Sequence, residues 1–129
     1  MGMKIVVVSF EEDKNKKLLA DYKVLSEEVK VTDFLNIFLQ SSYITDFEVF
    51  EEDEEVLYKE IKSNSIKSMS IELDEKGKTI FSSIKETSGN QKREEFLNNL
   101  EDIFYLNILL KKFCQELLNS KNKIKLIII

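Results

Sequence analysis

The sequence predicts an α+β fold, or a mixed α/β fold, in which a mixed or antiparallel sheet of about four strands packs against a long C-terminal helix and two or three shorter helices. Apolar runs at residues 3–10 and 123–129 are typical of strands that are buried on both faces. Residues 91–118 carry apolar side chains at helical spacing and predict the long helix. The 129 residues suffice for one hydrophobic core, so we expect a single domain over residues 1–129.

The segment after the first strand, residues 12–30, fits two interpretations. Its apolar residues Leu18, Tyr22, Leu25 and Val29 recur at helical spacing, which favours a helix. Residues 19–25 could equally pair back on the first strand across a charged turn. We expect the helix and keep the strand as the alternative.

Two threonines, Thr32 and Thr45, precede segments with the pattern of helix starts. Each hydroxyl can accept a hydrogen bond from a free backbone amide, and each threonine is followed by an aspartate that suits the positive end of a helix dipole. Thr45 and Glu48 also have the spacing of a capping box. We therefore expect helices at residues 33–42 and 46–63.

Residues 66–84 have the alternating pattern of a β-hairpin. Met69, Ile71 and Leu73 alternate with polar residues, and Gly77 ends a charged turn where a left-handed residue would be favourable. The final segment ends on three isoleucines. It should be taken up into the sheet beside the first strand, because an exposed strand of this composition would promote aggregation.

The predicted long helix is apolar on more than one face. One buried stripe includes Phe104 and Leu110, with Cys114 beside it as a small buried hydrophobe rather than a nucleophile. A second apolar face must also be covered, either by the rest of the domain or by a second copy of the chain. The candidate oligomer interface on this face consists of Tyr105, Leu106 and Leu109.

A run of acidic residues lies in the segment predicted as the second short helix. The run consists of Glu51, Glu52, Asp53, Glu54 and Glu55. It has two interpretations: a solvated helix face, or a partner-binding face that attracts a protein with a basic surface. The net charge of −5 is modest, so any such recognition would depend on this local patch.

Several function classes are excluded by composition. The chain contains no histidine and one cysteine, which rules out a histidine-based triad and a zinc site of the usual thiolate and imidazole kind within one chain. Three glycines cannot form a P-loop or a dinucleotide-binding motif. We assign no catalytic, cofactor-binding or metal-binding residue, although chemistry that uses carboxylates alone stays open.

Nucleic acid and membranes are not expected partners. Arg93 is the single arginine among 19 basic residues, so sequence-specific readout of nucleic acid is not expected. The apolar runs are too short to cross a bilayer, and the N-terminal segment lacks the pattern of a secretory signal. We therefore expect a cytoplasmic protein. The excess of lysine over arginine indicates an AT-rich genome, bacterial or viral.

These observations favour a small acidic protein that acts by stoichiometric binding of another protein and is not an enzyme. It would be an inhibitor, a toxin-immunity protein, a phage-type blocker of a host defence or nuclease, or a regulatory subunit. In general character the chain resembles such inhibitors, and this analogy transfers no residues. The alternative is a non-catalytic structural or oligomeric assembly protein, and a carboxylate-dependent enzyme comes third.

Overall fold

The computed structural model of the protein describes residues 2–10, 22–51, 54–86, 89–119 and 122–129, and the side chains of these residues except those of 49–51 and 54–56. Within these ranges the chain has an α+β fold, as predicted, with an antiparallel sheet, a long C-terminal helix and a shorter helix beside it.

The sheet has six strands in the order β2-β1-β6-β5-β4, and β3 also pairs with β1. All the pairings are antiparallel. The strands are β1 (Lys4–Phe10), β2 (Lys23–Val24), β3 (Val29–Lys30), β4 (Ile44–Glu51), β5 (Glu54–Ile61) and β6 (Lys123–Ile128).

The first and last strands lie inside this sheet, as predicted from their apolar runs. β1 pairs with β6 on one side and with β2 and β3 on the other, whereas β6 lies between β1 and β5. Ile5, Val6, Leu126 and Ile127 are fully buried. Two buried faces explain why both strands are continuously apolar instead of alternating.

The region before the first short helix forms strands where we expected a helix. β2 pairs back on β1, which confirms the alternative interpretation at residues 23 and 24. β3 also pairs with β1, at residues 29 and 30, beyond the 19–25 segment of that alternative. Residues 11–21 lie outside the described part of the chain. Helix α1 (Asp33–Phe38) begins as predicted, because the Thr32 hydroxyl accepts a hydrogen bond from the Leu35 N–H at 3.2 Å. It is shorter than the predicted 33–42 and is followed by a 3-10 turn, η1 (Ser41–Tyr43).

The predicted helix at residues 46–63 is wrong: this segment is the β4–β5 hairpin. Thr45 caps no helix and is instead paired with Glu60 across the two strands. Phe47 is paired with Tyr58, and its ring stacks on Phe10 of β1 with the centroids 5.8 Å apart. These aromatic contacts with distant residues outweigh the local capping signal, which is worth about 1 kcal/mol.

The predicted hairpin at residues 66–84 is also wrong, because a 3-10 turn, η2 (Ser63–Ser65), leads into helix α2 (Ile66–Glu86). The buried residues Ile66, Met69 and Leu73 are spaced for one face of a helix, although Met69 and Leu73 also fit an alternating strand. The helix is favoured because its apolar face packs against helix α3 (Asn90–Asn119). The bounds of α3 confirm the long helix predicted at residues 91–118. Gly77 therefore lies within a helix and not in a turn.

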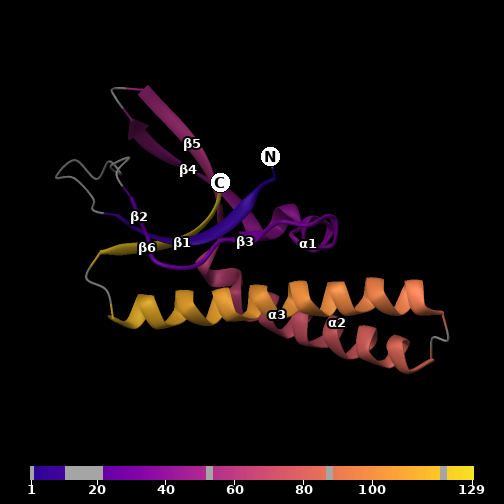
Figure 1. The fold of residues 1–129 in the computed structure, drawn as a ribbon. Coiled ribbons are helices and arrows are strands. Elements are labelled where there is room, and N and C mark those ends of the chain that lie inside the picture. The colour runs from indigo at the N-terminus through magenta and orange to yellow at the C-terminus, as the bar shows by residue number, and fades with distance from the viewer. Residues whose placement is uncertain (1, 11–21, 52–53, 87–88, 120–121) are drawn as a thin grey trace.

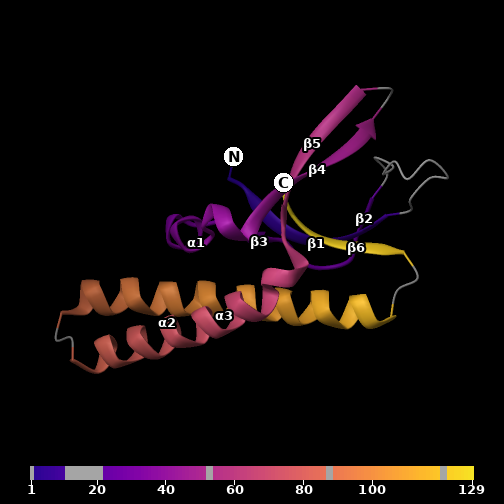
Figure 2. The ribbon, with the colours of Figure 1, turned by 180° about the vertical axis from the view of Figure 1, so that it is seen from behind.

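Helices α2 and α3 form an antiparallel pair beneath one face of the sheet, and the β4–β5 hairpin rises on the opposite side (Figures 1 and 2). The end of the helical pair that joins α2 to α3 extends beyond the sheet. The main core lies between the helices and the sheet, where Ile5, Val7 and Leu126 meet Leu106 and Phe113 of α3.

A second buried cluster lies on the other face of the sheet. Its buried members are Val6, Val8, Phe10, Phe47 and Ile127. Lys125 of β6 lies beside this cluster, with its Nζ 5.2 Å from the centroid of the Phe47 ring. The same Nζ atom is 2.5 Å from Oε2 of Glu60, and both side chains are mostly buried. An ion pair therefore joins β6 to β5 on this face of the sheet.

Candidate functional site

Helix α3 has a buried side and an apolar exposed side. Ile103, Leu106, Leu110 and Phe113 are among the residues that face the core. On the opposite side, Leu97, Phe104 and Ile108 are 55%, 60% and 50% exposed. Their spacing of seven and then four residues places them on one stripe of the helix. We call these three residues together with Tyr105, which is 48% exposed, the outer face of α3.

The predicted oligomer interface needs correction. Leu106 and Leu109 are buried in the core of the chain itself, so neither presents an exposed face on which a second copy could pack. Tyr105 is partly exposed and lies on the edge of the outer face. Leu106, the next residue along the helix, is turned by about 100° from Tyr105 and is fully buried, so the two residues do not form one exposed interface. Phe104, placed in the buried stripe by the sequence pattern, is exposed instead.

The predicted acidic face falls on a different type of element. The backbone of residues 51, 54 and 55 belongs to the β4–β5 hairpin, so a helical acidic face is excluded there. Residues 52 and 53 and the side chains of Glu51, Glu54 and Glu55 lie outside the described part of the chain. Their part in partner binding stays a prediction. Nearer the base of the hairpin, Asp46 and Lys59 form an ion pair across the two strands.

A pocket of about 750 Å³ opens beside the outer face, between α3 and the edge strand of the sheet. It arises from a bulge in that edge. Val24 pairs with Val8 and Val29 pairs with Ile5, so residues 25–28 lie opposite only residues 6 and 7 of β1. Bulges of this kind redirect side chains and are common near functional sites. The sequence gives no local signal for this bulge, because it depends on the register of both flanking pairs.

The hydroxyl of Ser26 holds the bulge in place. Its Oγ accepts a hydrogen bond from the N–H of Val7 at 2.9 Å, while the carbonyl of Val7 accepts one from the N–H of Leu25 at 2.8 Å. Ser26 therefore replaces the backbone carbonyl that a regular strand would offer to Val7. Since Val7 is fully buried, its N–H depends on this acceptor.

Replacing Ser26 with alanine is expected to destabilise the protein by about 1–2 kcal/mol, because the buried N–H of Val7 loses its acceptor. Urea unfolding followed by circular dichroism measures the change. Ser26→Thr retains a hydroxyl and is the matched control, with an expected loss below about 1 kcal/mol. Equal stability of Ser26→Ala and the unchanged protein would contradict this role of Ser26.

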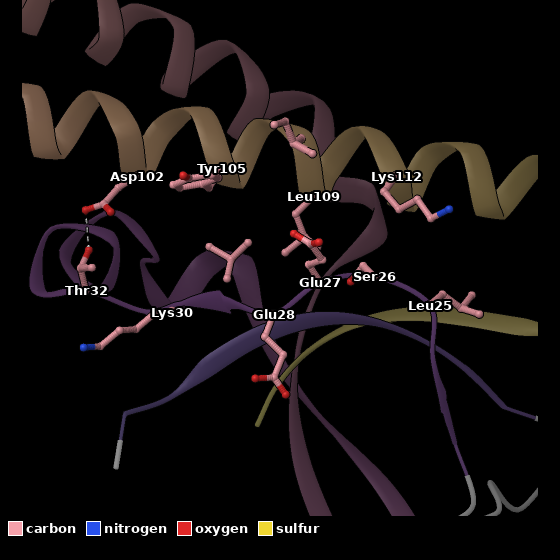
Figure 3. Close-up of a pocket in the computed structure, with 12 residues that line it drawn as sticks. Leu25, Ser26, Glu27, Glu28, Lys30, Thr32, Asp102, Tyr105, Leu109 and Lys112 are labelled. Atoms are coloured by element: carbon pink, nitrogen blue, oxygen red, sulfur yellow. Dashed lines mark hydrogen bonds between the residues drawn. The ribbon is translucent and has the colours of Figure 1, made fainter.

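The pocket combines an apolar lining with acidic groups. Val29 of β3 and Leu109 of α3 contribute apolar surface, and Tyr105 lies further along the helix toward Asp102 (Figure 3). Glu27 rises from the bulge toward α3, near Leu109 in the view of Figure 3. At one end, the hydroxyl of Thr32 donates a hydrogen bond to Oδ2 of Asp102 at 2.8 Å and so connects the start of α1 to α3.

Two carboxylates act on the phenol of Tyr105. A hydrogen bond to Glu101 raises the pKa of Tyr105, as do the negative charge of Glu101, partial desolvation and the charge of Glu27. Lys112 points away along α3, in the opposite direction to Tyr105, and forms an ion pair with Glu116 at 2.9 Å (Figure 3). The negative charge around Tyr105 is therefore not offset by Lys112.

The remaining side chains of the pocket are directed elsewhere. Lys30 points away from α3, and so does Glu28, whose carboxylate pairs with Lys4 at 2.6 Å (Figure 3). The centre of the pocket thus combines apolar groups, the phenol of Tyr105 and the carboxylate of Glu27, which pairs with no basic side chain in the described part of the chain. Such a surface is suited to binding a group that is both apolar and cationic.

Two further candidates for chemistry are the single cysteine and any group of metal-ligating side chains among the described residues. Cys114 is exposed and not buried as predicted. It lies on the same stripe of α3 as the buried residues Ile103 and Leu110, so the cover over this stripe ends before position 114. Among the described residues, no three cysteine or carboxylate side chains are grouped so that they could hold a metal ion.

Within the described ranges, neither α2 nor α3 has the apolar length that a membrane crossing requires. Comparisons of the chain with protein-family models, with curated proteins and with solved structures find no match.

Proposed function

We propose that this protein acts by binding another protein through the outer face of α3. The observation that carries the proposal is the exposure of Leu97, Phe104, Tyr105 and Ile108 on one side of a helix whose other side is already buried in the core. Solvent-facing positions of a helix are normally polar, and a group of exposed apolar side chains on one face is typical of a protein interaction site. Phe104 and Tyr105 are in ring contact, with Ile108 one turn further on, and Leu97 lies beyond Glu101 on the same stripe.

The mode of action that we propose is stoichiometric and non-catalytic, as in an inhibitor or a regulatory subunit of the cytoplasm. The lack of histidine in the chain supports a binding role over acid–base catalysis near neutral pH. The acidic residues 51–55 would add a second contact with a basic surface of the partner, affecting the rate of association more than the affinity. The competing proposal is homo-oligomeric assembly, in which a second copy covers the outer face.

Photo-crosslinking from the outer face tests this proposal. A photoreactive amino acid in place of Phe104, in the protein expressed in its native host, is expected to crosslink to one heterologous protein. The same amino acid in place of Lys67, an exposed residue near the start of α2, should give no such product. Mass spectrometry of the crosslinked product identifies the partner.

Variants of the crosslinking protein separate the possible results. Ile108→Glu should abolish the product while circular dichroism stays unchanged, because an exposed apolar side chain is replaced. Reversing the four glutamates at 51, 52, 54 and 55 to lysine should lower the yield. A product formed only with a second copy of the chain would instead establish homo-oligomeric assembly, and no product at position 104 would refute binding through this face.

A further inference from the structure

The pocket beside α3 is continuous with the outer face of the helix. Tyr105 and Ile108 belong to the outer face and also line the pocket. From there the lining continues inward to Leu109, which is buried, and across to Val29 and Leu25 on the edge strand. A partner that covers the outer face therefore meets the pocket as part of the same surface.

Negative charge is concentrated at the point where the pocket meets the outer face. Glu101 is hydrogen-bonded to the phenol of Tyr105 from one turn earlier on α3, and Glu27 rises from the edge strand toward α3 (Figure 3). Glu27 forms no ion pair with any residue that the structure describes. The lysines that line the pocket, Lys30 and Lys112, point away from its centre (Figure 3).

We propose that this pocket receives a basic and apolar segment of the partner protein, in which a lysine or arginine neighbours an aliphatic or aromatic side chain. This inference rests on the proposed function and names the chemistry of the partner. The apolar side chain packs between Val29 and Leu109. The cationic group lies against the ring of Tyr105, between the carboxylates of Glu27 and Glu101.

Charge complementarity selects this occupant over others. A cation over an aromatic ring is attracted by the ring, and carboxylates on either side accept charge-assisted hydrogen bonds from it. An acidic peptide or a phosphate group would meet the negative charges of Glu27 and Glu101 and be repelled. The volume of about 750 Å³ falls within the usual range of binding pockets, which is about 300–1,000 Å³.

A displayed library of random peptides, selected on the unmodified full-length protein, tests the inference. We expect enriched peptides to share a lysine or arginine within a few positions of an aliphatic or aromatic residue. The Kd of one enriched peptide, measured by fluorescence polarisation, should rise about tenfold for the double variant Glu27→Gln/Glu101→Gln. It should also rise with salt concentration for the unmodified protein.

Glu28→Gln is the matched control, because Glu28 lines the same pocket but pairs with Lys4 and points away from α3. Its Kd should stay within about twofold of that of the unmodified protein. Enriched peptides without basic residues, an unchanged Kd in the double variant, or no enrichment at all would each overturn the inference. None of these results would contradict the proposed binding through the outer face, which is tested separately by crosslinking from position 104.

Discussion

The variant Leu106→Glu is expected to be unfolded at room temperature, whereas Ile108→Glu two positions along the same helix is expected to stay folded. Leu106 is fully buried among residues of the sheet and of α3, so its replacement would bury a carboxylate without a partner. The cost of several kcal/mol would consume most of the stability of a small domain, which is about 5–15 kcal/mol.

Ile108 is half exposed, so its glutamate variant keeps its charge in water. The new side chain would also stand one turn before Lys112, a spacing that favours an ion pair, and the change in stability should remain below about 1 kcal/mol. Circular dichroism with urea unfolding measures both variants. A folded Leu106→Glu protein would contradict the placement of α3 and would restore the hypothesis of an interface at Leu106 and Leu109.

Lys125→Ala is expected to lower the free energy of unfolding by about 2–3 kcal/mol, because the carboxylate of Glu60 would be left largely buried and without its ion-pair partner. This cost is smaller than that of breaking a fully buried pair, since both side chains retain some contact with water. The double variant Glu60→Leu/Lys125→Met should recover most of this loss. Apolar side chains of similar length would fill the same space beside Phe47 without a desolvation penalty.

The ion pair between Asp46 and Lys59 supplies a matched comparison on the same hairpin. Both of its side chains are more than half exposed, so Lys59→Ala should cost less than about 1 kcal/mol. Chemical denaturation of the single and double variants gives the coupling energy between Glu60 and Lys125. If Lys125→Ala and Lys59→Ala had the same small effect, the buried pair would contribute no more than a surface pair.

The parts of the fold that the sequence predicts are those with one strong periodic pattern. β1 and β6 are continuous apolar runs, and α3 has apolar residues at helical spacing over many turns. Each of these patterns allows one interpretation. The segments that form β4–β5 and α2 fit both helical spacing and strand alternation over short stretches. Contacts with distant residues decide which of the two structures forms. The stacking of Phe47 on Phe10 and the packing of Leu73 against α3 are such contacts.

The candidate site was predictable only in part, and for a similar reason. An apolar surface on more than one face of α3 around residues 103–110 can be read from the sequence, and the exposure of Phe104 and Ile108 confirms it. The rotation of the helix about its axis cannot be read in that way, because it depends on where the sheet and α2 lie. Leu106, predicted to lie in an interface, is therefore buried in the core, and Phe104, predicted to be buried, is exposed. The pocket arises from a two-residue offset between β2 and β3, which no local pattern reveals.

The pairing of β1 with β6 has a kinetic consequence. These strands join residues 5 and 128, and residues 10 and 123, so the centre of the sheet closes across almost the whole described chain. Contacts of such long separation form slowly, because the loss of loop entropy precedes the gain from pairing. The α2–α3 pair needs only local contacts and should form early. Until β6 reaches its place, the apolar residues of β1 lack their cover on that side, and folding intermediates at this stage would be prone to aggregation.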